Sequence, residues 1–285
     1  MGKVVCFDLE GTLSSLSLDD HMLSVTAEHI KDGRELFQAL SRHTDKPGDV
    51  LRLVAPFLAA NLVTGLNLKS VSSKTNLVAG SRELIESLQE RKWKVFVMST
   101  SCEQHTLDVC GRLGVPENNV FYTKYPLDAC CSYIVEEREE IEEIEFAKEL
   151  ILNSENEKEI GLCLEELQRN QNVRAILQAI EVMDDSRKVQ VLNEVSKRTE
   201  TPLKEMAVVG NAVTANEILN EVKKKQGLAI AFNSDLLHAT IGVTASDLMD
   251  LRDVLSFWGK SSNREALKSA VKKKKFPCDV RWIEA

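Results

Sequence analysis

The stretch VVCFDLEGT, residues 4–12, decides the fold class that we predict for this chain of 285 residues. Its leading apolar residues are typical of a strand that is buried on both faces of a sheet. The run ends in a carboxylate at Asp8, and Gly11 then permits a sharp turn. Because the carboxyl ends of parallel strands open into the crevice where ligands bind, we expect Asp8 at the mouth of such a crevice. A carboxylate placed there can attack phosphorus or carbon or bind a metal ion, although an Asp at a strand end also serves as a structural cap.

Outside this stretch, short β-rich runs alternate with helical periods, which is the pattern of a parallel sheet covered by helices. Two segments interrupt the alternation, at about residues 18–77 and 127–185, and both have helical character without a convincing strand. The predicted fold class is therefore α/β, a doubly wound parallel sheet with inserted helical segments. We expect the sheet body to comprise residues 1–17, 78–126 and 186–285, with strands at 3–7, 94–98, 119–122, 206–209, 228–231 and 241–243.

Three further motifs carry polar groups that suit an anion. Ser99 and Thr100 follow an apolar strand, and a hydroxyl together with free backbone N–H groups of the next helix can hold a phosphate oxygen. Lys188, near the start of a predicted helix, can reach an anionic centre. Gly210 and Asn211 stand where another strand passes into a polar loop. Each motif can also be explained without a ligand, because hydroxyl residues at helix starts are usually caps and a single lysine on a helix is usually solvated.

In their order along the chain, these motifs resemble motifs one to four of the haloacid dehalogenase superfamily, over residues 3 to about 245. The resemblance is closer to the phosphoserine-phosphatase-like branch, within which an archaeal group shows similar runs. It implies a Rossmann-like core, with residues 18–77 as a helical cap of the first type and residues 127–185 as an additional helical insertion.

The resemblance also implies a mechanism through a phosphoaspartyl intermediate. Asp8 is the implied nucleophile and Glu10 the implied acid and base that protonates the leaving oxygen and later activates water. The other implied roles are phosphate binding by Ser99, Thr100 and Lys188, Mg²⁺ binding by Asp8, Asn211 and the backbone carbonyl of Glu10, and structural motif positions at Gly11, Thr12 and Gly210.

Two positions depart from the pattern of the superfamily. The acid and base position is normally Asp, and Glu10 keeps the carboxylate on a longer side chain. The fourth motif normally carries Gly-Asp and a second Asp four or five residues later, whereas this chain has Asn211, then Ala215 and Asn216. Because Mg²⁺ prefers charged oxygen ligands, we expect the loss of these carboxylates to weaken metal binding by a few kcal/mol.

Three functions are consistent with these motifs. The first is a hydrolase that acts as a phosphomonoesterase on a small phosphorylated metabolite, with a degenerate metal motif. The second is a catalytically impaired relative of the same fold that binds phosphate or a protein partner. The third is metal-free hydrolysis at carbon of the dehalogenase type, with which Asn211 is compatible, although the downstream Asp of those enzymes is absent.

Composition indicates which partners and which cellular compartment to expect. The net charge of −8, from 44 acidic and 36 basic residues, argues against a nucleic-acid partner, since phosphate backbones need a basic face. No apolar run approaches the roughly 20 residues that span a bilayer. The seven cysteines have no CxxC spacing, and no secretory leader pattern precedes Asp8. We therefore expect a cytoplasmic protein without a membrane or nucleic-acid partner.

Overall fold

The structure is a computed structural model that describes residues 3–15, 18–44, 46, 48–134, 138–211, 213–235 and 238–283. Its centre is a seven-stranded sheet in the order β3-β2-β1-β4-β5-β6-β7. Neighbouring strands run parallel except β6 and β7, which are antiparallel. The predicted α/β class with a doubly wound sheet is confirmed. The strands are β1 (Lys3–Asp8), β2 (Trp93–Cys102), β3 (Val120–Thr123), β4 (Ala207–Gly210), β5 (Leu228–Phe232), β6 (Ile241–Thr244) and β7 (Asp279–Trp282).

The strand order turns at β1, and this places the motifs at one edge of the sheet. Asp8 pairs in register with Met98 of β2, and Phe7 pairs with Val209 of β4. The carboxyl ends of β1 and β4 therefore lie level with one another and with Met98 of β2, which continues to Cys102, at the kind of switch point where α/β sheets bind ligands.

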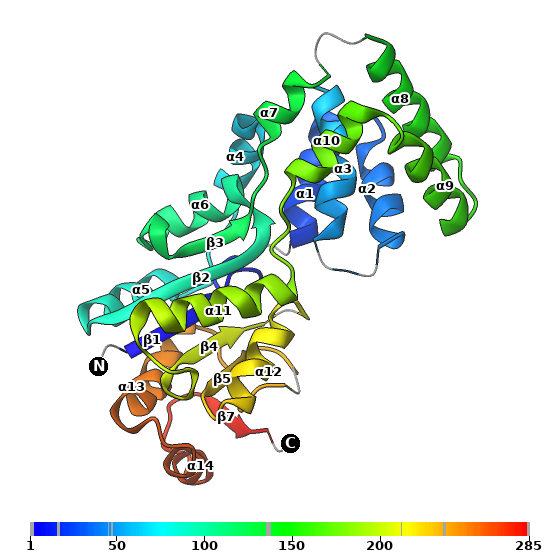
Figure 1. The fold of residues 1–285 in the computed structure, drawn as a ribbon. Coiled ribbons are helices and arrows are strands. Elements are labelled where there is room, and N and C mark those ends of the chain that lie inside the picture. Colours follow the sequence, from blue (N-terminus) through cyan, green and yellow to red (C-terminus); the bar gives the residue numbers. More distant parts are fainter. Residues whose placement is uncertain are drawn as a thin grey trace.

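Helices cover both faces of the sheet (Figure 1). Alternate residues of β1 explain why both faces need cover, because Val5 and Phe7 pack into one hydrophobic cluster while Val4 and Cys6 pack into another. The first cluster includes Trp258, whose side chain is fully buried. The covering helices are α5 (Ser81–Glu90), α6 (Glu103–Arg112), α13 (Leu251–Ser261) and α14 (Arg264–Lys272) on the first face, and α11 (Asp185–Thr199) and α12 (Asn216–Lys224) on the second.

A second, all-helical body stands beyond the carboxyl edge of the sheet (Figure 1). Its helices come from two distant parts of the chain, yet their apolar faces form one continuous hydrophobic cluster with the buried helix α3 among them. We call this body the cap. The boundaries predicted from the sequence stay predictions. The helices are α1 (Leu18–His29), α2 (Gly33–Arg42), α3 (Asp49–Ala60), α4 (Gly65–Ser73), α7 (Leu127–Ser132), α8 (Arg138–Leu152), α9 (Glu157–Leu167) and α10 (Gln171–Ala179).

In the described part of the chain, no single helix has the length and apolar character needed to cross a bilayer. The helices α3 and α4 meet that requirement only when they are taken together, and they bend by 116° where they join.

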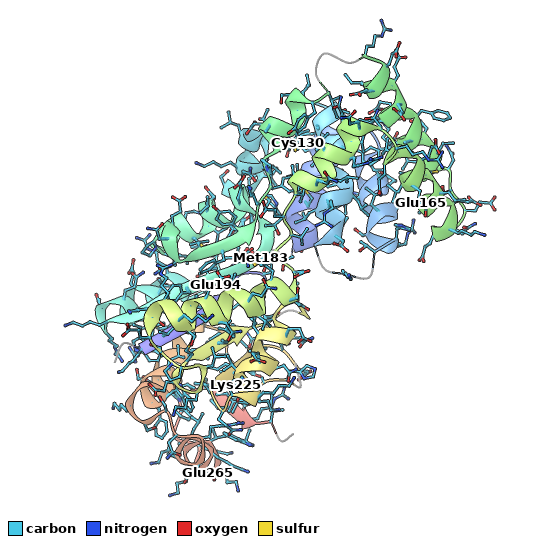
Figure 2. All side chains as sticks on the ribbon, viewed as in Figure 1. Cys130, Glu165, Met183, Glu194, Lys225 and Glu265 are labelled. Carbon is cyan, nitrogen blue, oxygen red and sulfur yellow. The ribbon has the colours of Figure 1, made fainter. Side chains whose placement is uncertain are left out.

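The chain passes between the sheet body and the cap at two hydrogen-bonded necks. In the first neck, residues 13–15 pair with residues 76–78, with Ser15 N donating to Asn76 O at 3.0 Å and Val78 N donating to Leu13 O at 3.0 Å. In the second neck, residue 124 pairs with residue 181 through two backbone bonds of 3.1 and 3.2 Å. Met183, which lies at the junction in Figure 2, follows directly after the second neck.

A buried polar cluster links the cap to the sheet body at a further point. The hydroxyl of Ser72 in α4 lies 3.0 Å from His21 Nε2 of α1 and 3.0 Å from His105 Nδ1 of α6. Burial lowers the pKa of His21 to about 4, and it lowers the pKa of His105 well below its ordinary value. Both imidazoles are therefore neutral near pH 7, so the cluster buries no net charge.

Candidate functional site

Asp8 and Lys188 form an ion pair at the carboxyl edge of the sheet, and both side chains are fully buried. Lys188 Nζ lies 2.6 Å from Asp8 Oδ1 and also donates to the backbone carbonyl of Thr214 at 3.0 Å. Helix α11 positions the lysine because the Asp184 side chain caps its first turn, accepting from Arg187 N. One turn further on, Lys188 shares the buried face of α11 with the apolar residues that pack on the sheet.

The surroundings of this pair set its protonation. Burial raises the pKa of Asp8 to about 7, opposed by the ammonium of Lys188 and reinforced by the charge of Glu10. The Thr214 hydroxyl also donates to Asp8 Oδ2 at 3.2 Å and favours the ionised carboxylate. Burial alone lowers the pKa of Lys188, but the carboxylates of Asp8 and Glu10 outweigh it and raise that pKa above its ordinary value. Lys188 therefore stays an ammonium, while Asp8 exchanges its proton near neutral pH.

Glu10 lies beside this pair and is 2% exposed. Its Oε1 accepts a hydrogen bond from Ser99 Oγ at 2.6 Å and a second from the backbone N–H of Ser101 at 3.0 Å. Its Oε2 is buried without a hydrogen-bond partner in the protein. The Thr106 hydroxyl of α6 lies 3.0 Å from Ser99 Oγ and 3.0 Å from the backbone carbonyl of Cys102.

Several hydroxyls near this site have no hydrogen-bond partner in the protein. The side-chain oxygens of Thr12, Thr100 and Ser101 are all buried and unpaired. Buried polar atoms are normally satisfied, so unpaired ones grouped near a carboxylate are available to a bound molecule or to water. Thr100 also contacts the cap, because a Cβ added at Gly48 lies 2.7 Å from its methyl carbon.

Gly11 and Asn211 bring the turn after β1 against the loop after β4. Gly11 has a φ of +68°, and a Cβ added there lies 2.7 Å from Asn211 Oδ1. The other end of the amide is used elsewhere, since Asn211 Nδ2 donates to the backbone oxygen of Phe232 at 2.8 Å. Gly210 is equally constrained, because a Cβ added there lies 2.3 Å from the Cβ of Ala215. Asn211 thus ties the loop to the end of β5 and turns its carbonyl oxygen toward Gly11.

The residues expected to hold Mg²⁺ fit that ion poorly. In the described ranges, no group of three or more His, Cys, Asp or Glu side chains is arranged to hold a metal ion. Of the expected ligands only Asp8 carries a charged oxygen toward the site, and both of its oxygens already accept hydrogen bonds, from Lys188 and Thr214. The remaining ligands are the amide oxygen of Asn211 and the backbone carbonyl of Glu10, a weak set for a hard divalent cation.

A cavity of about 410 Å³ adjoins the start of α11. Three carboxylates and one lysine contribute to it, and the lysine, Lys46, comes from the cap segment between α2 and α3. Burial raises the pKa of Asp185, with further contributions from Glu217 and Asp184 against the effect of Lys188. The lining residues are Lys46, Asp184, Asp185, Ser186 and Glu217.

The structure brings most of the residues singled out from the sequence into one place. Asp8 and Lys188 are in contact, and Ser99 contacts Glu10 rather than Asp8. Sequence reasoning missed Thr214, which binds both members of the ion pair. The sequence feature that could have identified Thr214 is its hydroxyl in the polar loop after β4, in which only Asn211 was chosen as a site residue. The backbone N–H of Ser101 and the hydroxyl of Thr106 were missed as well, because neither carries a signal in the sequence.

Comparison with known proteins identifies the fold. No protein-family model and no curated protein sequence matches this chain. A solved gene product of Archaeoglobus fulgidus superposes with a TM-score of 0.82 at 20% identity, covering 99% of this chain and 91% of the other. A substrate-bound phosphoserine phosphatase superposes with a TM-score of 0.56 at 15% identity, covering 90% of this chain and 98% of the other. A phospho-aspartyl intermediate analogue of phosphoserine phosphatase gives a TM-score of 0.54 at 15% identity, with the same coverage.

The chain therefore has the fold of the haloacid dehalogenase superfamily hydrolases. Phosphoserine phosphatases are among the structures that share it, at low sequence identity. This agrees with the resemblance drawn from the motifs.

Proposed function

We propose that this protein is a phosphomonoesterase that hydrolyses a small phosphorylated molecule through a phosphoaspartyl intermediate on Asp8. The observation that carries the proposal is the buried ion pair of Asp8 and Lys188, 2.6 Å apart at the carboxyl edge of the sheet. A carboxylate held beside an ammonium in a buried place can attack an anionic phosphoryl group, because the ammonium offsets the charge that the group brings in.

The residues divide the reaction between them. Asp8 forms a bond to phosphorus while the bond from phosphorus to the leaving oxygen breaks, and Glu10 in its acid form gives a proton to that oxygen. Glu10 then takes a proton from water, whose oxygen attacks phosphorus and releases Asp8 and inorganic phosphate. Lys188 and the Ser99 hydroxyl hold the transferring oxygens, and positioning and electrostatics of this kind do most of the work in phosphoryl transfer. Thr100 adds a buried hydroxyl to the same region.

The structural neighbours support this choice of chemistry. One neighbour was solved as a phospho-aspartyl intermediate analogue and another with its substrate bound, both described as phosphoserine phosphatase. This chain shares their fold, and its own Asp8 ends strand β1 at the carboxyl edge of the sheet. The substrate of these neighbours does not identify the substrate of this chain, because the residues that contact a substrate differ between proteins of one fold.

Mg²⁺ is the part of the proposal that the described residues support least. A bound cation would offset charge on the phosphoryl oxygens. Among the described residues, Lys188 provides a positive charge at that place. We therefore expect weak Mg²⁺ binding.

The cytoplasmic location remains a prediction from composition.

A second candidate function is phosphate binding without turnover. It is favoured by the loop after β4, in which Asn211 replaces the expected carboxylate and uses its amide to hold Phe232. In this case Asp8, Lys188 and Ser99 bind an anion but no covalent intermediate forms.

One experiment separates the two candidates. Phosphate release from p-nitrophenyl phosphate and from a panel of phosphorylated metabolites is measured with and without Mg²⁺, for the wild type and for Asp8→Asn. A phosphatase gives turnover that Asp8→Asn abolishes and whose kcat/KM rises with pH through about 7, because Asp8 must be ionised to attack. In ¹⁸O water, label should enter the released inorganic phosphate and not the Asp8 carboxylate, because the water oxygen attacks phosphorus. Saturable phosphate binding without turnover would leave the second candidate.

A further inference from the structure

The side chain of Glu10 occupies the hydrogen-bond donors that would hold an oxygen of a bound phosphoryl group. We propose that Glu10 is an internal competitor at this anion site, and that its carboxyl group must leave Ser99 and Ser101 before a phosphoryl group can bind. The inference rests on the proposed function for the identity of the anion. The inference gives Glu10 a second role beside that of acid and base, because its carboxyl group rests on Ser99 and Ser101 when no phosphoryl group is bound.

The hydroxyl of Ser99 has a single proton, and its direction is fixed by its neighbours. The Thr106 hydroxyl lies 3.0 Å from Ser99 Oγ and also 3.0 Å from the backbone carbonyl of Cys102, and the N–H of Ser101 points at Ser99 Oγ from 3.0 Å. Glu10 Oε1, a carboxylate oxygen at 2.6 Å, is the nearest acceptor and takes the Ser99 proton. A hydroxyl cannot donate one proton to two acceptors, so a phosphoryl oxygen can be held by Ser99 only in place of Glu10.

The Ser101 N–H adds a second donor to the same carboxyl oxygen, at 3.0 Å. A hydroxyl and a backbone N–H that converge on one oxygen at the end of a strand make the type of cradle that suits a phosphate oxygen. In the resting structure the cradle holds Glu10 Oε1, while Oε2 is buried with no partner. One half of the carboxyl group is bound firmly and the other half is unsatisfied.

The length of the side chain is what allows this contact. Aspartate, the usual residue at this motif position, is shorter by one carbon–carbon bond of about 1.5 Å. From the same backbone its oxygen would lie up to about 4 Å from Ser99 Oγ, beyond hydrogen-bond range. With Glu in place of Asp, the carboxyl group at position 10 can therefore accept hydrogen bonds from Ser99 and Ser101.

Charge makes the competition stronger. The negative charge of Glu10 acts on Asp8, whose pKa it raises, and on Lys188, whose pKa it also raises. A phosphoryl dianion that enters this buried place meets both carboxylates. When Glu10 leaves the cradle, the Ser99 hydroxyl and the Ser101 N–H become free and the carboxyl group is released for its role as acid and base. When phosphate departs, the return of Glu10 refills the cradle.

The test is the affinity for inorganic phosphate, measured by titration calorimetry in EDTA. The variants are Glu10→Asp, which keeps the charge but cannot reach Ser99, and Glu10→Gln, which keeps the length and removes the charge. We expect Glu10→Asp to bind phosphate about tenfold more tightly than the wild type or better, since each hydrogen bond to a charged group contributes strongly. Glu10→Gln should show a smaller gain. The double variant Glu10→Asp with Ser99→Ala should lose the gain, because the gain requires the freed Ser99 hydroxyl.

The inference is overturned if Glu10→Asp binds phosphate no more tightly than the wild type, or if the gain persists without the Ser99 hydroxyl. Circular dichroism and thermal unfolding of each variant confirm that it is folded. Turnover is measured separately on the same samples. A wild type without turnover, together with a tenfold gain in Glu10→Asp, refutes the phosphatase proposal and leaves the competitor in place. Turnover in the wild type without any gain in Glu10→Asp refutes the competitor alone.

Discussion

The buried ion pair predicts that replacing Lys188 by Met makes the stability of the protein depend on pH over a wider range. Asp8 and Lys188 are both fully buried and lie 2.6 Å apart. Burial raises the pKa of Asp8 to about 7, and the ammonium of Lys188 keeps it from rising further. A close opposite charge shifts a carboxyl pKa by roughly 1–3 units, so the variant should have an Asp8 pKa of roughly 8–10.

The sign follows from proton binding in the two states. Asp8 has an ordinary pKa of 3.8, so between about pH 4 and about pH 7 the folded protein holds a proton that the unfolded chain releases. The free energy of unfolding therefore falls as pH rises through this window, by about 1.4 kcal/mol per pH unit. In the wild type the fall ends at about 7, whereas in Lys188→Met it continues to the higher pKa. The variant should lose about 1.4–4 kcal/mol more than the wild type between about pH 7 and about pH 10.

Urea unfolding at several values from about pH 6 to about pH 9 measures this difference. Lys148→Met is the matched control, because Lys148 is also buried and paired, with Glu145 of the cap, but lies away from Asp8. Adding Asp8→Asn to Lys188→Met removes the titrating group and should remove the extra slope. A stability difference that stays constant above about pH 7, or a slope that survives in the double variant, would refute the coupling that we derive for this pair.

Three further changes have defined outcomes. Thr214→Val removes a hydroxyl that donates to Asp8, and urea unfolding at about pH 8 should show a loss of about 1 kcal/mol, with a smaller loss at about pH 5, where Asp8 is protonated and the bond is no longer to a charged group. Gly11→Ala places a Cβ 2.7 Å from Asn211 Oδ1 at a φ of +68°, and calorimetry should show a loss above the roughly 1–2 kcal/mol of the backbone strain alone. Asn211→Asp replaces the N–H donor to the last peptide carbonyl of β5 by a carboxylate oxygen, so we expect about 1–3 kcal/mol of lost stability. Adding Mg²⁺ should raise the melting temperature of Asn211→Asp more than that of the wild type. Equal rises in the two proteins would speak against a metal position beside this loop.

The sheet could be predicted from the sequence because buried parallel strands are nearly continuous apolar runs. β1, β2 and β4–β6 all have this character, and their observed ends lie within a few residues of the predicted ones. β7 was missed because it is a short antiparallel edge strand with alternating exposure, Asp279–Trp282. Such a strand forms through pairing with β6 and not through its own hydrophobicity.

The site could be predicted as a set of positions but not as a set of contacts. The strand ends fixed where Asp8 and Ser99 lie, since parallel register brings them level. Which acceptor the Ser99 hydroxyl uses depends on rotamers and on Thr106, seven residues away on α6, and neither is visible as a motif. The same holds for Asn211, whose Nδ2 donates to the end of β5, a contact that no motif shows, while the metal-binding role of its amide oxygen stays a prediction.

The two necks restrict how the cap can move against the sheet body. Each neck is a pair of segments locked together by backbone hydrogen bonds, one at residues 13–15 with 76–78 and the other at residues 124 and 181. The contact of Ser72 with His105 of α6 is a third link between the cap and the sheet body, so a swing of the cap about the two necks also strains that buried contact. A movement of the Gly48 segment away from Thr100 is therefore restrained at three places, the two necks and the Ser72 contact.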